Sequence, residues 1–196
     1  MIFTTFYKTY NEITLDKNNI LRYMKAKDNA PEIQSLLDEC ITLSKDKLKG
    51  KVCYSVFDIS FCGDTLDLGF TKTDSKALKT HLENCNKIVL FASTVGIDID
   101  MLVTKYSPLS PSKAFCIGAI GTEAVENICD RFCDDIATEY GECAARFSPG
   151  YADLPLDMQK EIFSVLDTKK IGLSLSDSLL MTPKKSVTAI IGIKNN

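Results

Sequence analysis

The sequence contains no tryptophan, a single histidine and no long apolar run. Its longest apolar stretches, such as residues 88–92, fall far short of the roughly 20 residues needed to span a bilayer. The first ten residues, MIFTTFYKTY, lack the basic start and long apolar run of a secretory signal. We therefore predict a cytoplasmic protein that does not interact with a membrane.

An excess of positive charge is also missing. The chain has 23 lysines and arginines against 26 aspartates and glutamates, a net charge of −3. Nucleic-acid-binding domains usually carry a basic excess or a basic stripe. The basic runs at residues 45–51 and 184–185 are short, which is typical of solvated surfaces. We predict that the protein has no nucleic-acid partner.

The eight cysteines include no C-x-x-C pair. The two closest, Cys129 and Cys133, are four residues apart, which places them on one face of a helix. Zinc sites usually contain two close cysteine pairs, or one pair with histidines, and the only histidine is His81. We predict buried structural thiols and no metal site. Two alternatives are a redox role for the cysteines and a cysteine-ligated metal or iron–sulfur protein. The second predicts colour or bound metal in the purified protein.

Helical and strand-like patterns alternate along the chain. Residues 1–50 carry helical spacing after Asp16 and after Pro31, and residues 52–94 are rich in strand-like alternation. A long helix is expected from Ser110-Pro111 to Gly141, because serine and proline favour a helix start and glycine a helix end. A helix at 156–167 and strands near 171–181 and 186–193 are expected to follow.

These patterns lack a regular βαβ order and predict an α+β fold. We expect a single compact domain with a mostly antiparallel, twisted sheet and flanking helices. Residues 1–50 would form a helical N-terminal segment packed on a core of residues 51–196. With 45% hydrophobic residues and 196 residues in all, the chain needs no metal or disulfide to fold.

Residues 146–155, RFSPGYADLP, contain the most informative motif. Proline, glycine and serine make this segment a loop. Arg146 can donate two parallel hydrogen bonds to a carboxylate, and Gly150 lets the backbone approach a ligand closely. Tyr151 offers a flat face and a hydroxyl. The combination suits an adenosyl ligand with a free amino-acid end, although an arginine before a Pro-Gly turn is more commonly a surface turn.

This loop, followed by a helix and by IGLSLSDSLLMTPKKSVTAIIGI, resembles the end of the activation domain of cobalamin-dependent methionine synthase. The family carries R-x-x-P-G-Y, a helix, and then G-x-x-L-T-E-S-x-x-M-x-P-x-x-S-V-S. The chain has Ser176-Asp177 in place of Thr-Glu and Thr188 in place of serine. It keeps Gly172, Leu175, Ser178, Met181, Pro183, Ser186 and Val187.

The resemblance implies that the protein binds S-adenosylmethionine and has no catalytic side chain of its own. Glu126, in TEAVENICDRF, matches a family glutamate that contacts this ligand. The implied binding residues are therefore Glu126, Arg146, Ser148, Gly150 and Tyr151. The family's N-terminal aspartate ligand and its C-terminal tyrosine contact have no match in this chain.

The resemblance also implies reductive methylation, in which inactive cob(II)alamin of a methionine synthase is reduced by a flavodoxin-like donor and methylated by S-adenosylmethionine. The methyl group would pass to cob(I)alamin, a step that belongs to methionine biosynthesis. The chain has no D-x-H-x-x-G motif, so cobalamin is expected only on a partner protein. Two alternatives remain: a non-catalytic docking partner of a corrinoid methyltransferase, and reactivation of a different corrinoid protein.

Overall fold

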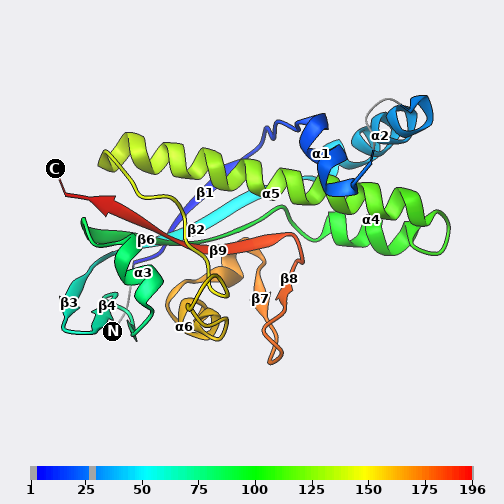
Figure 1. Ribbon diagram of the computed structural model, residues 1–196. Coiled ribbons are helices and arrows are strands. Elements are labelled where there is room, and N and C mark those ends of the chain that lie inside the picture. The colour runs from blue at the N-terminus through cyan, green and yellow to red at the C-terminus, as the bar shows by residue number, and fades with distance from the viewer. Residues whose placement is uncertain (1–3, 27–29, 196) are drawn as a thin grey trace.

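Four strands form the central sheet within residues 4–26 and 30–195, the part of the chain that the computed structural model describes (Figure 1). All neighbouring strands are antiparallel. The predicted α+β fold, a single domain with an antiparallel sheet and flanking helices, is confirmed. In spatial order the strands are β1 (Phe6–Tyr10), β2 (Gly50–Asp58), β6 (Cys85–Thr94) and β9 (Ser186–Lys194).

The inner strands are buried on both faces. In β2, Val52 and Tyr54 belong to the apolar cluster on one side of the sheet, whereas Cys53 and Phe57 belong to the cluster on the other side. The strand is therefore covered on both faces, which explains why apolar residues do not alternate strictly along it.

One face of the sheet is covered by α5 (Pro111–Tyr140), a helix of 30 residues (Figure 1). It begins and ends as predicted, with Pro111 in its first turn and Gly141 at its C-cap. Phe132 anchors it to the sheet, with its ring centre 5.2 Å from that of Tyr54 and 4.9 Å from that of Phe91. Around its N-terminal half lie α1 (Lys17–Met24), α2 (Pro31–Ser44), the turn η1 (Lys45–Lys47) and α4 (Asp98–Tyr106).

The opposite face is covered by short elements (Figure 1). Two of them, α3 (Lys76–His81) and α6 (Met158–Val165), contribute Leu78 and Ile162 to the second apolar cluster. The others are β3 (Ser60–Cys62), β4 (Thr65–Asp67), β5 (Lys72–Thr73), the turn η2 (Thr168–Ile171), β7 (Ser174–Leu175) and β8 (Met181–Thr182).

Three local expectations need correction. Residues 6–10, expected within a helical segment, form edge strand β1; Phe6 and Tyr7 are largely exposed, so the strand lacks the apolar alternation by which strands are recognised. Helix α4 was not expected, because only Ile99 of its residues is buried. The single strand expected near 171–181 is a 3-10 turn followed by a two-stranded hairpin.

Among the helices of the described residues, none is both long enough and apolar enough to cross a bilayer. Five of the eight cysteines are buried, two are partly buried and Cys62 is exposed. Within residues 4–26 and 30–195, no three histidine, cysteine or acidic side chains gather where they could hold a metal ion.

Candidate functional site

The candidate binding loop begins at the edge of the central sheet. After Gly141 the chain turns back beneath α5, and residues 143–147 run along the free edge of β9. Phe147 and Ile190 exchange two backbone hydrogen bonds of 2.8 Å. This pairing fixes the position of the neighbouring residue, Arg146, relative to the C-terminal half of α5.

Arg146 forms ion pairs with two carboxylates of α5. One guanidinium nitrogen lies 2.6 Å from Oε2 of Glu126, and the other donates a hydrogen bond to Asp130. Glu126 and Asp130 are one helical turn apart and therefore project from the same side of the helix. The structure thus brings together two of the predicted site residues and adds Asp130, which the sequence did not indicate.

This arginine is partly buried, with 26% of its side chain exposed. Burial lowers the pKa of Arg146, but the hydrogen bond with Asp130 and the neighbouring charges outweigh that effect, so the pKa is raised above its ordinary value. The guanidinium is therefore positively charged at any physiological pH. A ligand carboxylate that binds Arg146 therefore competes with these two acidic side chains for the guanidinium.

A hydrogen-bonded turn follows at residues 148–154. The N–H of Tyr151 donates to the carbonyl of Ser148 at 3.2 Å, and the N–H of Gly150 donates to the carbonyl of Leu154 at 2.9 Å. Gly150 has a φ of +86°, a conformation that glycine adopts without the steric cost of a Cβ. These hydrogen bonds hold the backbone at Ser148 and Gly150 in one conformation. The carbonyl of Ser148 and the N–H of Gly150 are both bonded within the turn.

Tyr151 presents an aromatic surface beside this turn. Its residue surface is 67% exposed, and its ring lies edge-on to Phe147 with ring centres 5.3 Å apart. Phe147 in turn contacts His81, with ring centres 5.2 Å apart. An exposed ring that is fixed by an aromatic neighbour can stack on a planar group such as a purine.

The short helix α3 holds the loop at both ends. Asp153 accepts hydrogen bonds from the Ser75 hydroxyl at 2.5 Å and from the Lys76 amide at 2.8 Å, both at the helix start. At the other end of the helix, Nε2 of His81 lies 2.6 Å from the carbonyl oxygen of Ala145. The Ser75 hydrogen bond, with the backbone donors, lowers the pKa of Asp153 below its ordinary value. Asp153 was not indicated by the sequence analysis.

The residues of the second family motif, which begins at Gly172, lie on the segment that leads into β9. Gly172, with a φ of +76°, ends the 3-10 turn η2, and Ser176 and Ser178 share a hydrogen bond of 2.9 Å in the β7–β8 hairpin. The Ser186 hydroxyl donates to the carbonyl of Pro183 at 2.7 Å, just where β9 begins. These residues shape the scaffold next to the candidate site.

Residues 132–196 of this chain match the model of one protein family, which is described as "Vitamin B12 dependent methionine synthase, activation domain". The crystal structure of the MetH reactivation domain bound to AdoHcy is similar over 98% of this chain and 79% of that chain, with a TM-score of 0.74 and 14% sequence identity. The chain has the fold of the MetH reactivation domain. A search of curated protein sequences gave no match.

The match to the activation-domain family contains both sequence motifs, because it extends from residue 132 through the loop at 146–155 to β9. The resemblance noted from those motifs is therefore confirmed. The likeness to the MetH reactivation domain also includes the N-terminal residues, for which the sequence alone gave no clear match. The individual ligand-binding roles of Glu126, Arg146, Ser148, Gly150 and Tyr151 stay predictions.

Proposed function

We propose that the protein binds S-adenosylmethionine at the loop that follows α5 and uses it to methylate cob(I)alamin carried by another polypeptide. The observation that carries the proposal is the ionic cluster of Arg146 with Glu126 and Asp130, followed five residues later in the chain by the exposed ring of Tyr151. The match of residues 132–196 to the activation-domain family supports the part of the site that contains Arg146 and Tyr151.

The cluster suits the zwitterionic end of S-adenosylmethionine. The ligand carboxylate takes the place of Asp130 on the Arg146 guanidinium, and the ligand ammonium pairs with Glu126. This exchange keeps the number of ion pairs constant, so no charge is left buried without a partner. Asp130 is the carboxylate that is displaced, because its side chain is 67% exposed and that of Glu126 is 37% exposed.

The turn then positions the rest of the ligand. Gly150 leaves room for close approach of the ribose, and Tyr151 stacks on the adenine ring. The backbone at Ser148 completes this side of the site. Because the turn is closed by its own hydrogen bonds, little ordering of the loop is needed when the ligand binds.

The chemistry requires positioning and no general base. One electron from a flavodoxin-like donor converts cob(II)alamin to cob(I)alamin. The cobalt(I) electron pair forms the bond to the methyl carbon, the carbon–sulfur bond breaks, and its electron pair stays on sulfur. The products are methylcobalamin and S-adenosylhomocysteine. The sequence has no D-x-H-x-x-G motif, and we assign cobalamin to a partner methionine synthase.

Isothermal titration with S-adenosylmethionine tests the ligand assignment. We expect saturable binding by the native protein and a loss of at least about tenfold in affinity for Arg146→Ala, since a hydrogen-bonded pair with a charged group contributes about 1.5–3 kcal/mol. Arg131→Ala is the matched control, because it removes the same charge from the C-terminal half of α5 and should leave the affinity unchanged. No binding by the native protein would contradict the assignment.

A reactivation assay tests the partner. The protein is mixed with a cob(II)alamin-bearing methionine synthase that lacks its own reactivation domain, an electron donor and S-adenosylmethionine. The appearance of the methylcobalamin absorption spectrum supports the proposal. If methylcobalamin forms only with a different corrinoid methyltransferase, that protein is the partner in place of methionine synthase.

A docking role without ligand is the second candidate function. It is favoured by the two carboxylates that already occupy Arg146 and by the closed turn at Gly150. This role predicts that the protein binds the corrinoid partner with equal affinity in the presence and absence of S-adenosylmethionine. The proposed methyl-transfer role predicts ligand-dependent product instead.

A further inference from the structure

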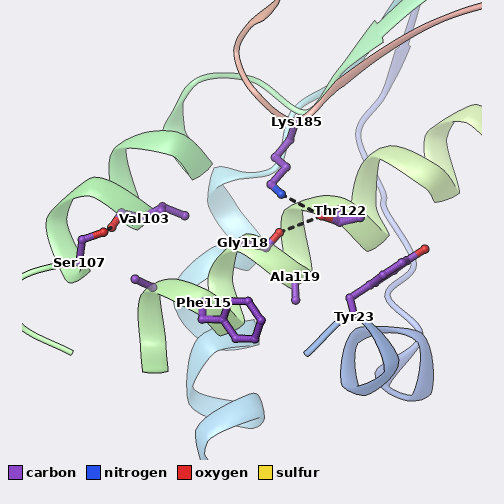
Figure 2. A pocket seen from close by; sticks show the side chains of 9 residues that line it. Tyr23, Val103, Ser107, Phe115, Gly118, Ala119, Thr122 and Lys185 are labelled. Atoms are coloured by element: carbon purple, nitrogen blue, oxygen red, sulfur yellow. Dashed lines mark hydrogen bonds between the residues drawn. The ribbon is translucent and has the colours of Figure 1, made fainter. Parts of the chain in front are cut away.

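A cavity lies at the N-terminal half of α5, away from the Arg146 cluster. It has a volume of about 480 Å³ and lies between α1, α4 and the N-terminal half of α5 (Figure 2). This volume is within the range of small-molecule sites in proteins. Glu126 lies eight residues beyond Gly118 on α5, a rise of about 12 Å along the helix. The residues that define the cavity include Tyr23, Val103, Phe115, Gly118, Thr122 and Lys185.

Gly118 opens this cavity. A Cβ at this position would meet no heavy atom within 4 Å, so the missing side chain leaves free space above the helix. Glycine inside a helix is less favourable than alanine by about 1 kcal/mol. Gly118 therefore lowers the stability of the helix, and no close neighbour within the chain requires a glycine at this position.

Apolar side chains form most of the wall. Phe115 stands on the rim of the cavity with 57% of its surface exposed, and Ala119 lies buried beside it (Figure 2). Tyr23 of α1 closes the opposite side. Such walls favour a ligand with an apolar body.

Lys185 supplies the cation at one end of the cavity. Its ammonium donates a hydrogen bond of 2.8 Å to the Thr122 hydroxyl, which donates in turn to the carbonyl of Gly118 at 3.1 Å (Figure 2). The sequence predicted solvated lysines at 184–185, yet Lys185 is half-buried and only Lys184 is exposed. Its hydrogen bond to Thr122 holds the side chain against α5, which accounts for this difference.

The charge of Lys185 has no ion pair among those of the described residues. Burial lowers the pKa of Lys185, and Asp100 offsets this in part. The Asp100 carboxylate, however, accepts the backbone N–H of Lys184 at 2.7 Å. A half-buried cation whose hydrogen-bond partner is a neutral hydroxyl is stabilised by an incoming anion.

We propose that this cavity binds a small organic monocarboxylate, with its carboxylate on Lys185 and its apolar body against Phe115 and Ala119. A single cation matches a single negative charge. A phosphate group, which usually gathers several donors or a helix N-terminus, is less well matched here. The inference is independent of S-adenosylmethionine binding at Arg146.

The test is a ¹H–¹⁵N NMR titration with 3-phenylpropionate and, as its neutral counterpart, 3-phenylpropionamide. We expect saturable shifts at the amides of Gly118 and Thr122, with a Kd of about 1 mM or below for the carboxylate, and at least tenfold weaker binding of the amide. Absence of saturable shifts at these residues with the carboxylate overturns the proposal.

Three variants separate shape from charge. Gly118→Leu fills the cavity and should abolish binding, whereas Gly118→Ala adds one methyl group and should retain binding within about threefold. Both variants are expected to stay folded, because each replaces a helical glycine by a better helix former. Lys185→Met should weaken binding of the carboxylate at least tenfold and leave that of the amide unchanged.

Retained binding in Gly118→Leu, or unchanged carboxylate affinity in Lys185→Met, also overturns the proposal. A parallel titration with S-adenosylmethionine distinguishes the two sites. Its affinity should be unchanged in Gly118→Leu, since the variant side chain lies about two turns of α5 from Glu126. Loss of S-adenosylmethionine binding in this variant would indicate that the cavity is part of the S-adenosylmethionine site. It would contradict the proposal of a separate carboxylate site.

Discussion

Oε2 of Glu126 lies 2.6 Å from a guanidinium nitrogen of Arg146, a residue 20 positions later in the chain. The contact exists because the chain reverses after Gly141 and pairs with β9, which carries Arg146 back beneath the C-terminal half of α5. Asp130 completes the cluster. The guanidinium is therefore already paired before a ligand arrives, and ligand binding becomes a competition between carboxylates.

We predict that Asp130→Asn strengthens S-adenosylmethionine binding. The substitution removes the exposed competitor for Arg146, and exposed ion pairs contribute about 0.2–1 kcal/mol, so the gain should be up to about fivefold. Glu126→Gln should weaken binding about tenfold, because the ligand ammonium loses its partner. Asp134→Asn, one turn farther along α5, is the control with the same charge change. If calorimetry shows weaker S-adenosylmethionine binding for Asp130→Asn, Asp130 does not compete with the ligand carboxylate for Arg146.

Gly150→Ala should destabilise the fold and impair the site. The φ of +86° costs a non-glycine residue about 1–2 kcal/mol, and the added Cβ would lie 3.3 Å from a methyl carbon of Leu156. Gly63→Ala is a matched control, since Gly63 also has a positive φ but no atom near a Cβ. Urea denaturation should show a loss of stability for both, and titration a loss of S-adenosylmethionine affinity for Gly150→Ala only.

The contribution of Asp153 to stability should depend on pH. Its pKa is lowered in the folded protein, so its stabilisation is present above its ordinary value of 3.8 and is lost as the pH falls through the lower folded value. Asp153→Asn should therefore be less stable than the native protein at neutral pH, and the difference should shrink below about pH 4. Chemical denaturation across this range measures it. Asp157→Asn, which removes an exposed carboxylate at the start of α6, is the control with the same change of charge.

The buried thiols should resist alkylation. Burial raises the pKa of Cys53 and of Cys129 to about 12, so their reactive thiolate at pH 8 is about a thousandfold scarcer than that of an ordinary cysteine. Cys62 is exposed and should react first with iodoacetamide. Peptide mass spectrometry after timed labelling measures the order. Equal rates at Cys62 and Cys129 would contradict the burial of the second thiol.

Much of the fold follows from local patterns. Helix α5 has a proline start, apolar residues at helical spacing and a glycine end, and β6 and β9 are continuous apolar runs. Strand β1 was missed because it lies at the sheet edge with exposed aromatic residues, and α4 because only Ile99 marks its buried face. Patterns of burial therefore identify inner elements well and peripheral elements poorly.

The candidate site was only partly accessible from the sequence. Loop composition singled out Arg146, Gly150 and Tyr151, because proline, glycine and an arginine are informative without a fold. Asp130 and Asp153 were missed, since their roles depend on partners 16 and 78 residues away. Lys185 was missed for the same reason, because its burial depends on Thr122, 63 residues earlier.

The position of β9 late in the chain and at one edge of the sheet has a kinetic consequence. Its partner β6 precedes it by roughly a hundred residues, with Thr94 opposite Ser186 and Cys85 opposite Lys194. A newly made chain can pair β1, β2 and β6 early, but one side of β6 stays open until the later strand arrives. Because distant pairings fold slowly, we expect this domain to expose an aggregation-prone edge during synthesis and to depend on chaperones more than a helical bundle of equal size.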